Sequence, residues 1–207
     1  MQIEARDLGR RYGRQWIFRH LSYAFQPGTA TAILGPNGAG KSTLLSILAG
    51  QLLPTEGTVT YAHGGRPLPV AGVPRYLAYC APYLELPEDF TLLELLAFHT
   101  RLKPLQAGIT PAGLVDIMYL QRARHQLVRE FSSGMKQRLK LGLALYAAAP
   151  LLLLDEPTTN LDATGAAWYQ EHVARVRQDP ERVVLVSSNV QAEYGFCTEQ
   201  VRITDFQ

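Results

Sequence analysis

The residues from Gly35 to Thr43 form the segment of this sequence whose chemistry is easiest to name. They read Gly-Pro-Asn-Gly-Ala-Gly-Lys-Ser-Thr and fit the pattern G-x-x-x-x-G-K-[ST] in full. In such a loop, glycines allow backbone N–H groups to turn inward towards phosphate oxygens. Lys41 would then reach the β- and γ-phosphates of a nucleotide, and the Ser42 hydroxyl would bind Mg²⁺. The predicted phosphate-binding residues are Gly35, Pro36, Asn37, Gly38, Ala39, Gly40, Lys41, Ser42 and Thr43.

The flanking residues predict the structure that such a loop needs. Residues 29–34 are expected to form a buried strand, and residues 42–49 a helix. The positive N-terminal end of that helix would face the same phosphates as the loop. A glycine-rich turn with a chance lysine would not require this strand–loop–helix order, so we favour the phosphate-binding interpretation.

A second polar pair follows the apolar run Leu151–Leu154. The run predicts a buried strand of a parallel sheet, and Asp155 at its end is placed to hold Mg²⁺. Glu156 comes next and would orient the attacking water or accept its proton. Taken alone, these two residues would be a polar strand end and turn. Beside a complete phosphate loop, we expect a metal ligand and a catalytic base.

Elsewhere, strand and helix patterns alternate, which predicts an α/β fold with a helical insertion. Further strands are expected near residues 2–6, 21–25, 58–61, 76–80 and 183–186. Helices are expected near residues 92–98, from residue 110, over 139–149 and over 163–177. Residues 63–69 are expected to be a surface loop, and His172 is expected on the exposed face of its helix.

Composition excludes several classes of protein. The length of 207 residues predicts one domain, and a net charge of +2 is too small for a main partner that is nucleic acid. No apolar run approaches the roughly 18 residues that span a bilayer, and the first residues show no signal-peptide pattern. Cys80 and Cys197 lie far apart, which favours free thiols in a reducing compartment. The five histidines lack metal-ligand spacing.

The segment from Phe131 to Arg138 reads Phe-Ser-Ser-Gly-Met-Lys-Gln-Arg. It resembles the signature of the ATP-binding-cassette (ABC) ATPases, in which L-S-G-G-Q precedes K-Q-R. Ser132 and Gly134 match that signature, while Phe131, Ser133 and Met135 depart from it. A serine hydroxyl and free N–H groups at a helix N-terminus make an anion site. In the family, this site closes on the γ-phosphate held by the other subunit of a dimer. Ser132 or Ser133 would also serve as the N-cap.

The resemblance continues at two further positions. Tyr12 stands where the family places an aromatic ring that stacks on adenine, and we favour that role over the alternative of an ordinary edge-strand aromatic. Asp162 ends the segment Thr158-Thr-Asn-Leu-Asp, which resembles the family's D-loop at the dimer interface. Asp162 is also expected to cap the helix that follows, and both roles can hold together.

The resemblance implies a P-loop NTPase (RecA-like) core with an antiparallel β subdomain and an inserted α-helical subdomain. Residues 1–207 would form one ABC ATPase domain, with 1–81 and 146–207 as the nucleotide-binding core and 82–145 as the helical subdomain. The family binds ATP with Mg²⁺, forms homodimers or heterodimers, and drives a transmembrane permease that is here expected as a separate chain. The protein would be cytoplasmic and peripheral on the inner face of the membrane, and the permease would dock in a groove beside residues 82–98. No nucleic-acid partner is expected, and no regulatory domain is expected after the short stretch that follows Asn189. Small haem-exporter ATPases share this compactness.

Two positions depart from the family's pattern. Pro82 stands where a glutamine usually contacts magnesium or the attacking water, and Asn189 stands where a histidine usually contacts the γ-phosphate. An asparagine amide can donate a hydrogen bond but cannot carry a positive charge. We therefore expect slow hydrolysis. The alternatives are a degenerate cassette that acts as a slow ATP-binding switch and a soluble, non-transport cassette ATPase.

Overall fold

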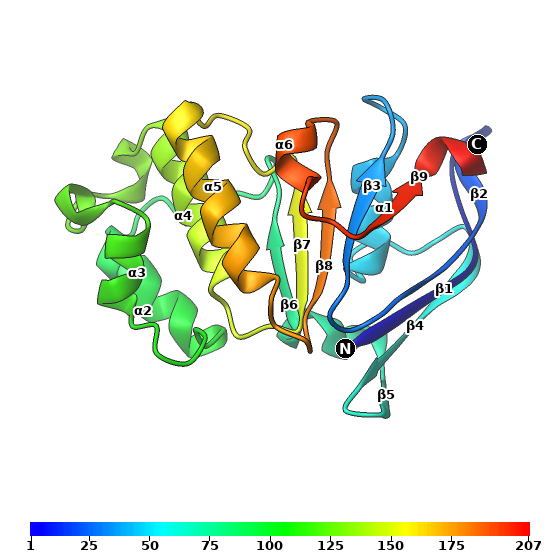
Figure 1. Ribbon diagram of the computed structural model, residues 1–207, viewed down its shortest axis with the longest axis horizontal. Helices are drawn as coiled ribbons and strands as arrows, with labels where there is room; N and C mark the ends of the chain where they lie inside the picture. Colours follow the sequence, from blue (N-terminus) through cyan, green and yellow to red (C-terminus); the bar gives the residue numbers. More distant parts are fainter.

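The computed structural model describes residues 1–207 and contains two β-sheets and a group of helices (Figure 1). The antiparallel sheet has the strand order β2-β1-β4-β5. Its strands are β1 (Gln2–Tyr12), β2 (Gln15–Phe25), β4 (Glu56–His63) and β5 (Arg66–Leu68). Strand β1 is therefore an interior strand, and its last residue is Tyr12.

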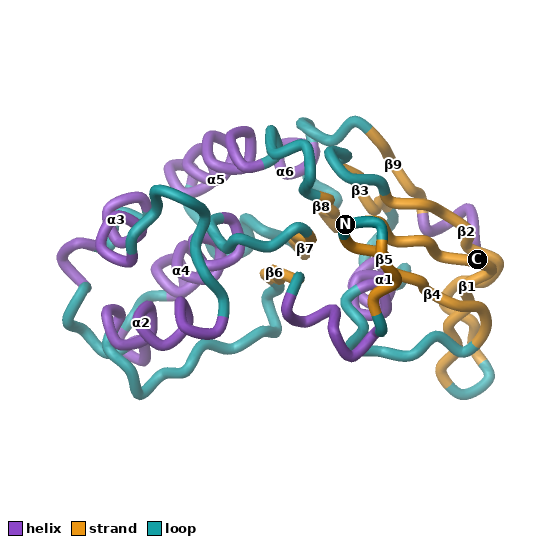
Figure 2. Tube along the Cα trace, turned by 90° about the horizontal axis from the view of Figure 1, so that it is seen from below, coloured by secondary structure: helices purple, strands orange, loops and turns teal.

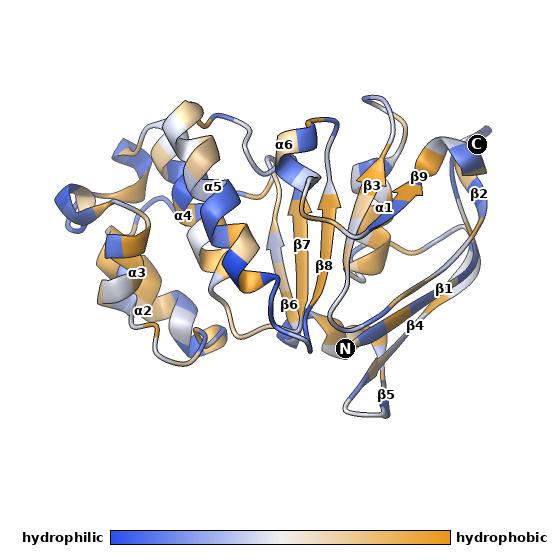
Figure 3. Cartoon of the chain, in the orientation of Figure 1, coloured by the Kyte–Doolittle hydropathy of each residue, from blue (hydrophilic) through white to orange (hydrophobic).

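The second sheet is parallel and has the order β6-β7-β8-β3-β9. Its strands are β3 (Ala30–Leu34), β6 (Leu77–Cys80), β7 (Leu151–Asp155), β8 (Val183–Ser187) and β9 (Glu199–Arg202). Every residue of β7 and β8 is buried, and both strands are strongly hydrophobic along their length (Figure 3). The carboxyl ends of β3, β7 and β8 lie side by side, at the edge where open parallel sheets bind ligands.

The helices within residues 92–176 lie at one end of the molecule and strands β1, β2 and β4 lie at the other, whereas the helix of residues 41–48 lies among the strands, as Figure 2 shows from below. The helices are α1 (Lys41–Leu48), α2 (Leu92–Leu102), α3 (Pro111–Ile117), α4 (Ser133–Leu145), α5 (Ala163–Val176) and α6 (Gln191–Tyr194). Four short 3₁₀ turns lie at Val70–Arg75, Gln121–Ala123, Val128–Glu130 and Ile203–Phe206. No helix is long and apolar enough to cross a membrane.

The continuous apolar run of β7 is explained by cores on both faces of the parallel sheet. Leu152 and Leu154 pack into a core formed with the helices α2 to α5. Leu151 and Leu153 pack into the other core, together with α1 and the antiparallel sheet. Both faces of the strand are thus covered, so alternation of polar and apolar residues is not needed. This confirms the predicted α/β fold, while the division at residues 82 and 145 stays a prediction.

Three local predictions were wrong: the loop over residues 63–69, the bounds of the helix expected over 139–149, and the exposure of His172. Residues 63–69 are not a loop, because Gly64 and Gly65, with φ of 57° and 73°, form a tight turn that leads into strand β5. The helix expected over 139–149 starts at Ser133 and ends at Leu145. Its last carbonyls instead accept hydrogen bonds from the buried Arg182 guanidinium.

His172 was also misplaced, since it is only 5% exposed. Its ring pairs with the Tyr146 hydroxyl and packs against Trp168. Trp168, His172 and Val176 recur every four residues and form the inner stripe of α5. The imidazole therefore packs in the core, and burial lowers its pKa.

Candidate nucleotide-binding site

The loop between β3 and α1 has the shape that the sequence predicts. Helix α1 begins at Lys41, and its N-cap is Gly40, which has no side chain to bond the free N–H groups of the first turn. Those groups remain available to an anion. Gly40 has a φ of 103°, and a Cβ there would lie 2.2 Å from Ile17 Cγ2. Only glycine therefore allows the helix to start at this point.

Lys41 is folded back onto its own loop. Its ammonium group donates hydrogen bonds to the carbonyl oxygens of Gly35 at 2.7 Å and Pro36 at 3.2 Å. Burial lowers the pKa of Lys41, while the carboxylates of Glu156 and Asp155 oppose that shift. The charge is thus held at the centre of the loop, where phosphate oxygens could take the place of the carbonyl oxygens.

Asp155 ends β7 beneath the loop and is 1% exposed. Neither of its carboxylate oxygens accepts a hydrogen bond of ordinary geometry, and the buried Ser187 hydroxyl is also without a partner. Burial raises the pKa of Asp155, and the nearby hydroxyls of Ser42 and Ser187 and the charge of Lys41 lower it. An unpaired buried carboxylate is costly unless something compensates for it.

A magnesium ion fits this arrangement. Mg²⁺ prefers a few hard oxygen ligands and commonly binds through one or two protein groups together with phosphates. The Asp155 carboxylate and the Ser42 hydroxyl provide such oxygens on adjacent elements. No cluster of three His, Cys, Asp or Glu side chains could hold an ion alone, which agrees with a metal shared with a nucleotide.

Glu156 leaves the sheet in an unusual backbone conformation. Its φ is 43°, in the left-handed region that non-glycine residues seldom adopt. Its N–H donates to the carbonyl oxygen of Ser187 at 2.9 Å, which anchors the turn to β8. The side chain is exposed and lines a cavity with the phosphate loop. Backbone strain that directs a carboxylate into such a cavity is typical of functional sites.

Asn189 follows β8 and lies against the same loop. Its side-chain amide donates to Asn37 Oδ1 at 2.7 Å. Two segments that are 152 positions apart in sequence therefore meet at the phosphate loop. The contact that the family resemblance implies between this position and the γ-phosphate stays a prediction.

The cavity above the loop has a volume of about 310 Å³. It is lined by Tyr12, Ile17, Asn37, Gly38, Gly40, Lys41, Ser42, Thr43 and Glu156. Tyr12 is half-exposed here, and the Arg10 guanidinium lies over one face of its ring at 4.5 Å. Tyr12, the phosphate loop and the Glu156 carboxylate thus share one cavity.

The signature residues lie in a different cavity. Ser132, Gly134, Met135 and Asp162 line a hollow of 270 Å³ that shares no residue with the first. Ser132 is the N-cap of α4 and accepts a hydrogen bond from the Met135 N–H at 3.3 Å, whereas Ser133 is the first helical residue. Within one chain, the signature residues and the phosphate loop therefore line separate cavities.

Asp162 has the capping role that the sequence predicted. Its carboxylate accepts hydrogen bonds from the Gly165 N–H at 2.7 Å and the Thr164 hydroxyl at 2.8 Å. The hydrogen bond from Gly165 contributes most to lowering the pKa of Asp162, and the bond from Thr164 adds to it. The Arg138 Nη2 atom lies 3.7 Å from Asp162 Oδ1. The residue is thus a negative charge at the start of α5, beside the signature helix.

Two supporting residues were missed by sequence reasoning. Gln137 is buried in α4 and donates to the carbonyl oxygen of Pro157 at 2.7 Å. Glu193 is buried in α6 and accepts hydrogen bonds from the N–H and hydroxyl of Thr158. Both hold the segment that follows Glu156. The K-Q-R run after the signature was a signal for Gln137, but no pattern pointed to Glu193.

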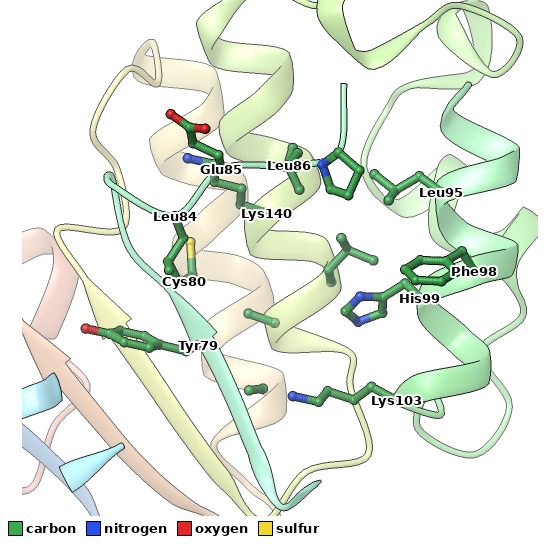
Figure 4. Close-up of a pocket in the computed structure, with 14 residues that line it drawn as sticks. Tyr79, Cys80, Leu84, Glu85, Leu86, Leu95, Phe98, His99, Lys103 and Lys140 are labelled. Atoms are coloured by element: carbon green, nitrogen blue, oxygen red, sulfur yellow. The ribbon is translucent and has the colours of Figure 1, made fainter. Parts of the chain in front are cut away.

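A third cavity of 270 Å³ lies between β6, α2 and α4 (Figure 4). Its walls are mainly apolar and include Leu84, Leu86, Leu95 and Phe98, with Lys103 and Lys140 among the polar groups. The Lys140 ammonium donates to the carbonyl oxygen of Pro82 at 3.1 Å. Phe98 is 47% exposed and stacks on Phe90. This groove lies beside residues 82–98, where the sequence analysis expected a docking surface.

A parallel sheet with a phosphate loop after β3 and an acidic pair after β7 defines a P-loop nucleotide-binding protein. The family model described as "ABC transporter" matches residues 18–159. This chain therefore belongs to the ABC transporter family, as an ATP-binding-cassette ATPase.

Individual proteins agree with this assignment. The chain is 33% identical over 183 residues to the cytochrome c biogenesis ATP-binding export protein CcmA of Brucella abortus, covering 86% of this chain and 82% of that protein. It is 32% identical over 188 residues to ATP-binding cassette sub-family A member 9 of Mus musculus, which is 89% of this chain but only 11% of the mouse protein. A dimeric structure of MJ0796, a bacterial ABC transporter cassette, superposes with a TM-score of 0.80 at 19% identity, covering 97% of this chain and 93% of that chain.

Proposed function

We propose that this chain binds Mg-ATP in the cavity above the phosphate loop, dimerises around two ATP molecules and drives a separate membrane permease. The observation that carries the proposal is the division of the site. Lys41 and Glu156 line one cavity, while Ser132 and Gly134 line another. A second copy, placed head to tail, would bring each signature onto the nucleotide of the other chain. A heterodimer with another cassette ATPase would meet the same requirement.

Each residue has a role that follows from its position. The loop N–H groups and Lys41 would bind the phosphates, and Tyr12 would stack on the base. Ser42 and Asp155 would hold Mg²⁺, which would neutralise charge that develops on the phosphates. Glu156 would orient the attacking water and accept its proton. Asn189 would contribute a neutral hydrogen bond to the γ-phosphate.

We further propose that hydrolysis is slow in the isolated subunit. Pro82 offers only its carbonyl, which is engaged by Lys140, and Asn189 cannot become positively charged. Stabilising contacts to the reacting group are commonly worth about 100-fold in rate each. A cassette with very slow turnover would instead act as an ATP-binding switch. The rate of phosphate release distinguishes such a switch from an ATPase that drives transport.

The permease is proposed to dock a short segment in the groove of Figure 4, which would place this chain on the inner face of the membrane. The apolar walls and the exposed Phe98 support this, as does the name of the relative CcmA, an export protein.

Two experiments test the proposal. Phosphate release by the purified chain should require both ATP and Mg²⁺. Cross-linking from the exposed position 102, at the end of α2, in native membranes should capture a protein with several membrane spans, and Phe98→Glu should abolish that capture without changing ATP binding. Absence of Mg-dependent hydrolysis and of ATP binding would contradict the proposed activity.

A further inference from the structure

Strand β6 and the segment that follows it carry two tyrosines to which the proposed nucleotide site gives no role. Tyr79 lies in β6, and Tyr83 follows Pro82 directly. Their hydroxyl oxygens are 2.5 Å apart, and their rings meet edge to face with centroids 6.3 Å apart. The two side chains therefore form a hydrogen-bonded pair across the proline.

The pair connects to helix α1 through Ser46. The Tyr83 hydroxyl lies 3.4 Å from Ser46 Oγ, and Ser46 Oγ donates to the carbonyl oxygen of Ser42 at 2.8 Å. Because the serine proton is used in the bond to Ser42, Tyr83 must donate to Ser46, and Tyr79 must donate to Tyr83. The hydroxyls thus form a directed chain that ends on the backbone of Ser42, a proposed magnesium ligand.

The two rings have different surroundings: Tyr79 is partly buried, whereas Tyr83 is exposed next to the groove. This difference is consistent with a connection between the groove and the interior of the fold. Tyr79 is directed away from the groove side that carries Phe98 and His99 (Figure 4). Burial raises the pKa of Tyr79 well above its usual range, with the Tyr83 hydroxyl and the charge of Asp155 adding to the effect. Tyr83 is 51% exposed and leads directly into Leu84, which lines the groove.

We propose that Tyr83, held by Tyr79, is a positioning residue that couples the groove wall to the magnesium site through Ser46 and Ser42. The inference rests on the proposed ATPase function. A partner that moves residues 84–87 would move the Tyr83 hydroxyl, and with it the first turn of α1. The chain of hydroxyls supplies a connection that does not depend on a polar side chain at position 82.

The test compares the magnesium dependence of phosphate release in single-hydroxyl variants of the full chain. Tyr83→Phe should lower kcat about three- to tenfold and raise the Mg²⁺ concentration for half-maximal rate by a similar factor, as expected for one lost hydrogen bond. ATP affinity measured without Mg²⁺ should change less than about twofold, since the phosphate loop is intact. Ser46→Ala should have the same effect, and the double variant should be no worse than either single one, because both break one chain.

Tyr76→Phe is the matched control. It removes a hydroxyl from the residue that enters the same strand but lies outside the chain to Ser46, and it should leave the magnesium dependence unchanged.

Three results would overturn the inference. Tyr83→Phe could behave like wild type, its effect could add to that of Ser46→Ala, or its loss of rate could come with an unchanged magnesium dependence. If the wild-type chain hydrolyses ATP and Tyr83→Phe has no effect on the rate or its magnesium dependence, only this coupling is refuted. A wild-type chain without Mg-dependent hydrolysis would instead refute the proposed function.

Discussion

The replacement of Glu156 by glutamine tests the proposed site most directly, because the structure indicates that the change would affect hydrolysis without affecting the stability of the fold. The Glu156 side chain makes no hydrogen bond within the protein and is exposed in the cavity beside Lys41. Glutamine has the same shape and tolerates the same backbone. We therefore expect the free energy of unfolding of Glu156→Gln to stay within about 0.5 kcal/mol of wild type.

The effect on hydrolysis should be large. An amide cannot accept a proton from water, and the loss of general-base catalysis costs roughly 10²–10⁴-fold in rate. ATP binding should persist or tighten, because one negative charge near the phosphates is removed. Gel filtration with ATP should then show an earlier, dimeric peak for the variant. Phosphate release within a factor of ten of wild type would show that another group acts as the base.

A second substitution at this position, Glu156→Gly, distinguishes the energetic cost of the Glu156 backbone conformation from the role of its side chain. Left-handed backbone costs a non-glycine residue roughly 1–2 kcal/mol, and Glu156 has a φ of 43°. Glycine relieves that cost but loses about 0.5–1 kcal/mol through its freedom in the unfolded chain. Glu156→Gly should therefore unfold in urea at the same or a slightly higher concentration than wild type, while hydrolysis is lost. A clear loss of stability would mean that the carboxylate is a structural group.

Three further changes have defined outcomes. Lys41→Ala removes a charge-assisted contact worth roughly 1.5–3 kcal/mol, so the dissociation constant for ATP should rise about 10- to 150-fold in a labelled-nucleotide titration. Asn189→His should raise phosphate release by up to roughly 100-fold at saturating Mg-ATP with little change in affinity; a slower variant would show that Asn189 is an adapted catalytic group. Burial holds the pKa of His172 below 6.5, so the unfolded state binds the proton more readily and stability should fall as the pH drops from about 7 to 5. His172→Gln should reduce that slope in urea unfolding, and an identical slope would refute the assignment.

The phosphate loop and the acidic pair could be predicted because their chemistry is local. The backbone around Gly40 and the strand that ends at Asp155 are determined by neighbours in sequence, so residue type and order carry the information. The same holds for the caps at Ser132 and Asp162, which bond to N–H groups three residues on.

The remaining features depend on tertiary contacts that no spacing reveals. His172 looked like a surface residue until the packing of α5 placed it against Tyr146 and Trp168. The end of α4 is set by Arg182, which is far away in sequence. Glu193 acquires its role only because α6 folds over the segment after β7. In each case the partner is distant in the chain, and local propensity is overridden.

The arrangement of the two cavities gives the short segment from Glu156 to Asp162 a particular importance. Glu156 lines the nucleotide cavity, and Asp162 lines the signature cavity. The segment between them is fixed on one side by Gln137 of the signature helix and on the other by Glu193, which follows the Asn189 loop. A shift of α4 would therefore pull on Pro157, next to the proposed base, while a shift at Asn189 would pull on Thr158. A closely packed segment transmits displacement from its anchors. In the proposed dimer, closure of the second copy onto the signature would therefore change the position of Glu156 without any contact between that copy and Glu156.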